Sequence, residues 1–168
     1  MASAFVDQIA VIAFIGLLAW AAFSDYRTYL IPNAISLAVV ALYPAHVLAS
    51  SVPVDWTGGL VVAACVLAVG FILFAMRLAG GGDIKMLTAV SLWAGPAHIL
   101  PFLLLTAIAG GLLALTTLGY LRYVRPLPSN AIAADEATAL KLRASVPYGI
   151  AVAVGGLWLA IKMLGQGA

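Results

Sequence analysis

The sequence predicts an all-α, polytopic membrane protein with about six transmembrane helices. Hydrophobic residues make up 65% of the chain, whereas Asp, Glu, Lys and Arg together make up only 8%. A typical soluble domain carries roughly 25% charged residues, which its surface needs. The few charges here are clustered between long apolar runs, so we expect lipid to be the solvent for most of the surface.

Crossing a hydrocarbon core of about 30 Å takes roughly 20 helical residues. The long uncharged runs of the chain cover residues 8–24, 34–54, 56–76, 86–121 and 146–161. The fourth run is too long for one span, and it contains Gly95, Pro96 and Pro101. Because proline disrupts a helix interior, we predict a short helix over 84–93 and a longer one over 99–120. The chain then has six spans.

The basic residues predict how these helices are oriented. With six spans and both termini outside, only Lys162 of the 8 basic residues lies on the outer side. Basic residues prefer cytoplasmic loops, and an error of one span in the middle would destroy this asymmetry. The residues assigned to the cytoplasmic side are Arg27, Arg77, Lys85, Arg122, Arg125, Lys141 and Arg143.

Residues 122–145 form the only extended polar stretch, which we interpret as a cytoplasmic loop. Pro126 and Pro128 open this loop, and residues 133–143 form either a short amphipathic helix or a disordered segment. No internal repeat or second domain is evident. We therefore predict a single transmembrane domain over residues 1–168 that contains this loop.

Several kinds of function are not expected from this composition. No basic run and no interleaving of aromatic and basic residues indicates nucleic-acid binding. The single cysteine, Cys65, excludes a disulfide within one chain and a CxxC zinc site, and we interpret it as a packing residue. His46 and His98 map to the outer side as interfacial histidines, so no Ser-His or Cys-His arrangement is credible. With HExxH also absent, we expect neither a metal nor a cofactor.

The acidic residues divide into two groups. Asp25 and Asp83 each adjoin an apolar span at the same predicted membrane face. The others, interpreted as solvated surface groups, are Asp7, Asp55, Asp135 and Glu136.

Asp25 ends the first predicted helix. A carboxylate at that position faces the negative end of the helix dipole and is poorly placed for stability. It is either an interfacial carboxylate in a turn with Arg27 or a group held for chemistry. The following segment favours the second interpretation, since Pro32 fixes a backbone dihedral and Asn33 can cap a helix that begins at Ala34.

Asp83 follows Gly80, Gly81 and Gly82 and precedes Lys85 by two residues. The glycines are either a flexible hinge or a backbone that another chain can approach closely, so that an extended substrate segment can hydrogen-bond to it. The short helix predicted after Asp83 is only about 15 Å long, half the hydrocarbon thickness. Either it continues through a kink, or Asp83 lies in a water-filled recess, where an ionisable group is usually functional.

A pair of carboxylates that shares a proton is the minimal machinery of aspartic proteolysis. One carboxylate, ionised, takes a proton from the attacking water, while the other, protonated, polarises the amide carbonyl. The sequence does not assign these roles, because coupled carboxylates titrate together. The alternatives are a small proton-coupled transporter, for which acids should be distributed across the membrane depth, and a scaffold without activity.

The two acidic segments together resemble the paired motifs of type IV prepilin peptidases. Asp25 stands six residues before the Ile-Pro-Asn of residues 31–33, and residues 80–85 read GGGDIK. The second segment resembles the GxGD signature followed by x-Lys, which presenilin and signal peptide peptidase share more loosely. Residues 146–149 also resemble the proline-glycine element at the start of the family's last helix, although a proline is tolerated in any first helical turn. The likeness extends over most of the chain.

The resemblance implies a membrane aspartic endopeptidase with Asp25 and Asp83 as its catalytic residues. Lys85 is a candidate for tuning Asp83 or orienting a carboxylate, and otherwise an ordinary positive-inside anchor. The residues with implied supporting or substrate-binding roles are Gly80, Gly81, Gly82, Lys85, Pro32, Asn33, Pro147, Tyr148 and Gly149.

The resemblance also implies the biological setting. The substrates would be prepilin or pseudopilin precursors, cut at the cytoplasmic edge of their hydrophobic helix after a short basic leader. The enzyme would lie in the bacterial inner membrane with its active site facing the cytoplasm, and the pilus assembly machinery is a further expected partner. Many family members carry an additional region with paired cysteines, linked to methylation. With Cys65 alone, this chain resembles the short form of tight-adherence (Flp) pilus systems, and we predict no methyltransferase activity.

Overall fold

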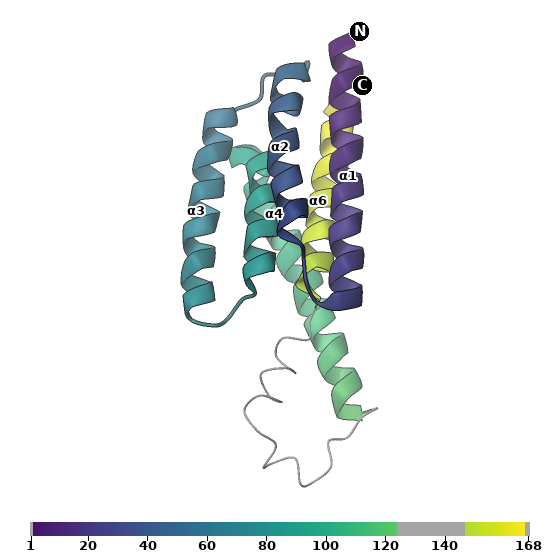
Figure 1. Cartoon of the computed structure of the whole chain (residues 1–168), viewed down its shortest axis with the longest axis vertical. Coiled ribbons are helices and arrows are strands. Elements are labelled where there is room, and N and C mark those ends of the chain that lie inside the picture. The colour runs from purple at the N-terminus through teal and green to yellow at the C-terminus, as the bar shows by residue number, and fades with distance from the viewer. Residues whose placement is uncertain (1, 124–146, 167–168) are drawn as a thin grey trace.

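The computed structural model describes residues 2–123 and 147–166, and this part of the chain is a bundle of antiparallel helices (Figure 1). Its helices are α1 (Ala2–Thr28), α2 (Asn33–Ala49), α3 (Trp56–Ala75), α4 (Gly81–Tyr123) and α6 (Tyr148–Gln166). The all-helical fold class is confirmed for these residues. Of the predicted loop over 122–145, all but its first two residues lies outside the described part, including the segment 133–143.

Helix α4 turns back on itself at Gly95. This glycine has φ 54° and ψ −173°, values that residues with a side chain rarely adopt. Pro96 then begins the second half, where its missing N–H has no helical partner to lose. The first half runs up beside α2 and α3, and the second runs back down beside α6 (Figure 1). The predicted interruption is confirmed, but the helical halves begin at Gly81 and Pro96 rather than at residues 84 and 99.

The core lies between α1, α2, α6 and both halves of α4. Its largest fully buried side chains include Phe14, Leu18, Met86, Phe102 and Leu159. Helix α3 contributes little to this core, because only Gly59, Ala63 and Gly70 of its residues are buried. Cys65 on α3 is exposed, so its interpretation as a packing residue is wrong.

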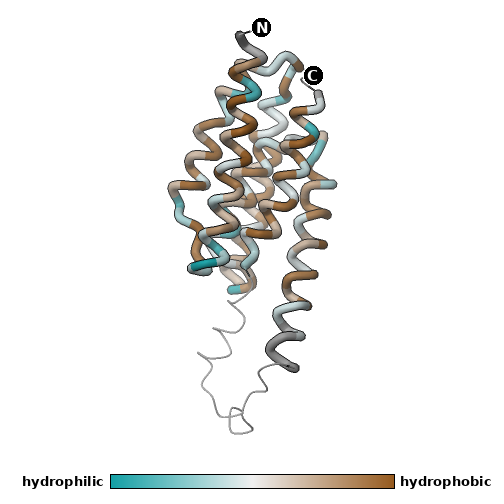
Figure 2. The backbone as a smooth tube through the Cα atoms, turned by 90° about the vertical axis from the view of Figure 1, so that its right-hand side faces the viewer, coloured by the Kyte–Doolittle hydropathy of each residue, from teal (hydrophilic) through white to brown (hydrophobic). Residues whose placement is uncertain are grey.

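The outer surface of the bundle is apolar, as a lipid-facing surface requires. In the part of the chain that the structure describes, four helical segments are long and apolar enough to cross a membrane: Phe5–Thr28, Trp56–Ala75, Gly81–Thr117 and Tyr148–Gly165. Helix α2 is also apolar, although it is shorter. Figure 2 shows hydrophobic positions along the length of the bundle and many of the hydrophilic ones toward its ends.

Two helices end at a residue in the left-handed conformation that is not glycine. Tyr29 follows α1 with φ 53°, and its N–H donates to the carbonyl of Asp25 at 2.8 Å. Arg77 follows α3 with φ 57°, and the N–H of Leu78 closes the last turn on the carbonyl of Leu73 at 2.9 Å. Glycine is the usual residue at such a position, since a side chain costs about 1–2 kcal/mol there.

At the end of the bundle where α1 begins, which we call the closed end, the partly buried Asp7 pairs with the buried His46. Asp7 Oδ1 and His46 Nδ1 lie 2.5 Å apart, with side chains only 14% and 6% exposed. The His46 ring stacks on Trp93, which also stacks on Phe14. The interpretations of Asp7 as a solvated group and of His46 as a plain interfacial histidine are therefore wrong. The antiparallel packing of α1 and α2 brings the two together.

Asp55 lies outside the candidate membrane spans and caps the beginning of α3. Its Oδ1 accepts hydrogen bonds from the Gly58 N–H and the Thr57 hydroxyl, both at 2.9 Å. These two bonds hold the pKa of the Asp55 carboxyl below its usual value. Its role is thus that of a helix N-cap.

Candidate active site

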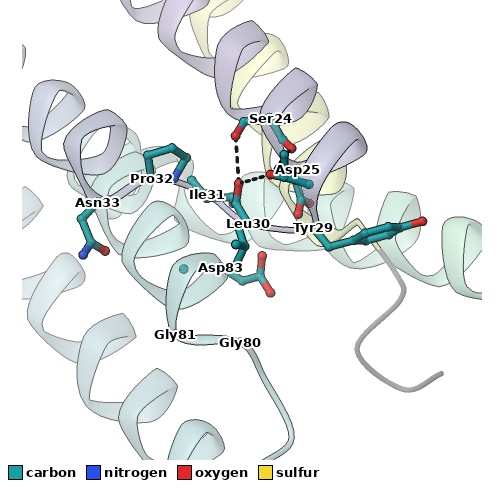
Figure 3. Close-up of a pocket in the computed structure, with 12 residues that line it drawn as sticks. Ser24, Asp25, Tyr29, Leu30, Ile31, Pro32, Asn33, Gly80, Gly81 and Asp83 are labelled. Carbon is teal, nitrogen blue, oxygen red and sulfur yellow. Dashed lines mark hydrogen bonds between the residues drawn. The ribbon is translucent and has the colours of Figure 1, made fainter. Parts of the chain in front are cut away.

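A cleft of about 680 Å³ lies at the opposite end of the bundle from Asp7. It is formed by the last turn of α1, the connection to α2, and the first turn of α4 with Gly80 before it (Figure 3). Both Asp25 and Asp83 line it. The lining residues are Ser24, Asp25, Thr28, Tyr29, Leu30, Ile31, Pro32, Asn33, Gly80, Gly81, Gly82 and Asp83.

Asp25 is held in place by the beginning of α6. The residue is only 4% exposed, and its Oδ2 accepts a 2.6 Å hydrogen bond from the backbone N–H of Gly149. Gly149 lies in the first turn of α6, where the helix dipole favours a negative charge. This contact offsets the unfavourable position of Asp25 in the last turn of α1. A Cβ at residue 149 would lie 2.8 Å from Asp25 Oδ2, so only glycine allows so close an approach.

Asp83 lies in the first turn of α4, because that helix begins at Gly81. Its carboxylate folds back toward Gly80, where a Cβ would come within 2.7 Å of Oδ2. Gly82 faces the backbone of Ile31. A Cβ placed on Gly82 would lie 3.4 Å from the carbonyl oxygen of Ile31. Gly81 and Gly82 therefore belong to the first turn of α4, and Gly80 precedes it.

The connection between α1 and α2 is fixed by hydroxyl groups that the sequence analysis did not single out. Ser24 Oγ donates to the carbonyl oxygen of Leu30 at 2.9 Å, whereas Thr28 Oγ1 donates to the carbonyl oxygen of Ser24 at 2.8 Å and lies 3.3 Å from the Leu30 oxygen. Two hydroxyl residues four positions apart lie on one side of a helix, and that spacing around Asp25 was the available signal. These bonds set the cleft wall that faces Asp83.

Lys85 and Asn33 contact each other rather than the acids. Lys85 Nζ donates to Asn33 Oδ1 at 3.0 Å, which joins the first half of α4 to the beginning of α2. Helix α2 begins at Asn33 itself, with Pro32 before it and no side-chain cap. The expectation that Asn33 caps this helix is wrong, because its side-chain oxygen is engaged by Lys85.

The remaining predicted residues lie where α6 begins. Pro147 immediately precedes α6, and Tyr148 is its first residue. The Tyr148 ring packs against α4 at Gly110, where a Cβ would lie 2.6 Å from Tyr148 Cε2. The structure thus brings Gly149 to Asp25, whereas the Tyr148 ring packs against the second half of α4.

The geometry gathers two carboxylates from separate helices into one cleft. Within residues 2–123 and 147–166, no basic side chain forms an ion pair with either of them. Carboxylates that are paired with cations are held in the ionised state, whereas a pair facing a cleft is free to exchange a proton with a substrate or water. This arrangement suits acid–base chemistry.

Comparisons with known proteins place this site in a family. Residues 12–115 match the type IV leader peptidase family, a segment that includes both Asp25 and Asp83. No significant match was found among curated proteins or among solved structures. Since the matched segment covers more than half of the chain, the chain belongs to the type IV leader peptidase family.

Proposed function

We propose that this protein is an aspartic endopeptidase that removes the leader peptide of type IV or Flp-type prepilins, with Asp25 and Asp83 as the catalytic pair. The observation that carries this proposal is that both aspartates line one cleft although they come from different helices. Family membership supplies the peptidase activity and the prepilin class of substrate.

The proposed reaction needs one proton on the pair. The ionised carboxylate takes a proton from a water molecule as its oxygen attacks the scissile carbonyl carbon, while the protonated carboxyl donates a hydrogen bond to the carbonyl oxygen. The tetrahedral intermediate then collapses, the C–N bond breaks, and the leaving amine takes a proton from the pair. Asp25 and Asp83 return to the shared-proton state.

We further propose that the cleft faces the cytoplasm of a bacterial inner membrane, with six spans and both termini outside. The halves of α4 run in opposite directions, which supports counting them as two spans. Arg27 and Lys85 are close in sequence to the two aspartates, and Arg77 precedes the glycines of the cleft. These basic residues support a cytoplasmic position for the cleft. The proposed cleavage at the cytoplasmic edge of the precursor's hydrophobic helix is consistent with the same position.

Co-expression with a Flp-type prepilin tests this proposal. Wild type, Asp25→Asn and Asp83→Asn are compared for conversion of the precursor, since Asn keeps the size of Asp but cannot ionise. We expect wild type to cut and both variants to fail while accumulating in the membrane. Cleavage by either variant at the wild-type rate would eliminate the proposed pair. If wild type cleaves none of several leader-bearing prepilins, a transporter or an inactive scaffold would become the favoured function.

A further inference from the structure

Tyr29 lies at the mouth of the cleft and has a left-handed backbone conformation that residues with a side chain rarely adopt. It follows α1 with φ 53°, and its N–H forms the bond to Asp25 that terminates the helix. Glycine or asparagine is the usual residue there. A strained residue beside a candidate site is a reason to ask what its side chain does.

Arg77, the comparable residue of α3, has an evident compensation that Tyr29 lacks. A basic side chain just after a helix interacts favourably with the last carbonyls and with the negative end of the helix dipole. A phenol ring provides neither benefit. Arg77 also does not line the cleft, whereas Tyr29 does.

The Tyr29 side chain is positioned to contact something outside the chain. Tyr29 is 52% exposed, next to Leu30 at 71%. In Figure 3 its ring extends from the cleft mouth, away from the carboxylates of Asp25 and Asp83. The carbonyl of Leu30 accepts a hydrogen bond from the Ser24 hydroxyl, which holds the backbone next to the ring.

We propose that Tyr29 is a specificity residue whose ring packs against an apolar side chain of the substrate at the mouth of the cleft. This inference rests on the proposed function. Aromatic side chains provide a large contact area at low conformational cost. The alternative role is that of an interfacial anchor, since tyrosines are common at the membrane surface. Tyr26 provides the comparison, because it is 68% exposed on the same helix end and does not line the cleft.

The experiment uses the purified full chain in lipid vesicles, with prepilin cleavage measured for wild type, Tyr29→Gly, Tyr29→Asn and Tyr29→Phe. We expect Tyr29→Gly and Tyr29→Asn to raise KM about tenfold with little change in kcat. Their melting temperatures should be equal to or above that of wild type, because both residues tolerate the left-handed conformation. Tyr29→Phe should keep KM within about twofold, as the ring is retained.

Two controls separate contact from conformation and anchoring. Arg77→Gly places glycine at the other left-handed position, which does not line the cleft. Tyr26→Ala removes an exposed aromatic ring from the same end of α1. Both should leave KM unchanged. An unchanged KM for Tyr29→Gly, or an equal rise for Tyr26→Ala, would overturn the inference while leaving the peptidase proposal standing. If wild type cuts no prepilin, the proposed function fails, and the inference fails with it.

Discussion

Each end of the bundle contains an aspartate that is wholly or largely removed from solvent, but the partners of these aspartates differ. At the closed end, Asp7 is paired with His46, and the imidazole stacks on Trp93. At the cleft end, the one hydrogen bond that the Asp25 carboxylate accepts within residues 2–123 and 147–166 comes from a backbone N–H, and Asp25 shares an open cleft with Asp83. Burial of an ionisable group therefore does not by itself indicate catalysis. The partner of the acid and its access to a substrate distinguish a structural pair from a reactive one.

The largest expected effect is on kcat/KM, when an aspartate at the cleft end rather than at the closed end is replaced by asparagine. Asp25→Asn and Asp83→Asn should each lower kcat/KM for prepilin cleavage by on the order of a thousandfold, because each removes a proton-transfer group. Asp7→Asn should stay within about twofold of wild type, since Asp7 is far from the cleft. Initial rates of the purified proteins in lipid vesicles give these values. A loss for Asp7→Asn equal to that of the cleft variants would erase the distinction between the two ends.

Gly149→Ala tests whether α6 holds Asp25 in place. The added methyl group would lie 2.8 Å from both Asp25 Oδ2 and Ile31 Cδ1. We expect kcat to fall about a hundredfold, as displacement of a catalytic group by about 1 Å does, and the free energy of unfolding to fall by about 1–3 kcal/mol. Gly111→Ala is the matched control, because a Cβ there meets nothing within 4 Å. Wild-type kcat in Gly149→Ala would mean that Asp25 does not depend on this contact.

The closed end should affect stability and leave catalysis unchanged. Asp7→Ala leaves the His46 Nδ1 without its partner, so we expect the free energy of unfolding to fall by about 1–3 kcal/mol. The Asp7→Ala/His46→Ala double variant should lose less than the sum of the single losses, as contacting residues do. Thermal unfolding in mild detergent measures both quantities. Additive losses would indicate that the two side chains do not interact.

The smallest expected effect concerns Lys85 and Asn33. Their hydrogen bond is exposed, so Lys85→Met and Asn33→Ala should each cost about 1 kcal/mol or less. We expect kcat/KM to fall only a few fold, with the double variant no worse than either single variant. Steady-state kinetics on the same prepilin provide the comparison. If Lys85→Met loses as much activity as Asp83→Asn, Lys85 acts directly on the carboxylates.

Much of the fold was predictable because it depends on composition and on strong local signals. The apolar runs predicted the helices, and Gly95-Pro96 predicted the turn within α4. The beginning of α4 was placed too late, because three glycines favour a loop when read locally. In the structure, Gly82 is close to Ile31, and this tertiary contact stabilises a helical first turn.

The site was predictable as a pair of motifs but not as a set of contacts. The segments around Asp25 and Asp83 predicted both aspartates as candidate site residues, and in the structure both line one cleft. The bond between Lys85 and Asn33 and the pairing of Asp7 with His46 depend on how distant helices align, which one sequence does not reveal. The conformation of Tyr29 was also missed, because no glycine marked that position as left-handed.

A double-variant kinetic cycle tests most directly whether Asp25 and Asp83 act as one unit. Cleavage of a Flp-type prepilin is followed with enzyme in excess for wild type, Asp25→Asn, Asp83→Asn and the double variant. If the two carboxylates act on the same peptide bond, the double variant should be about as slow as the slower single variant, because groups that work together are not additive. A double variant whose loss is the product of the two single losses, or a single variant as fast as wild type, would contradict the catalytic pair.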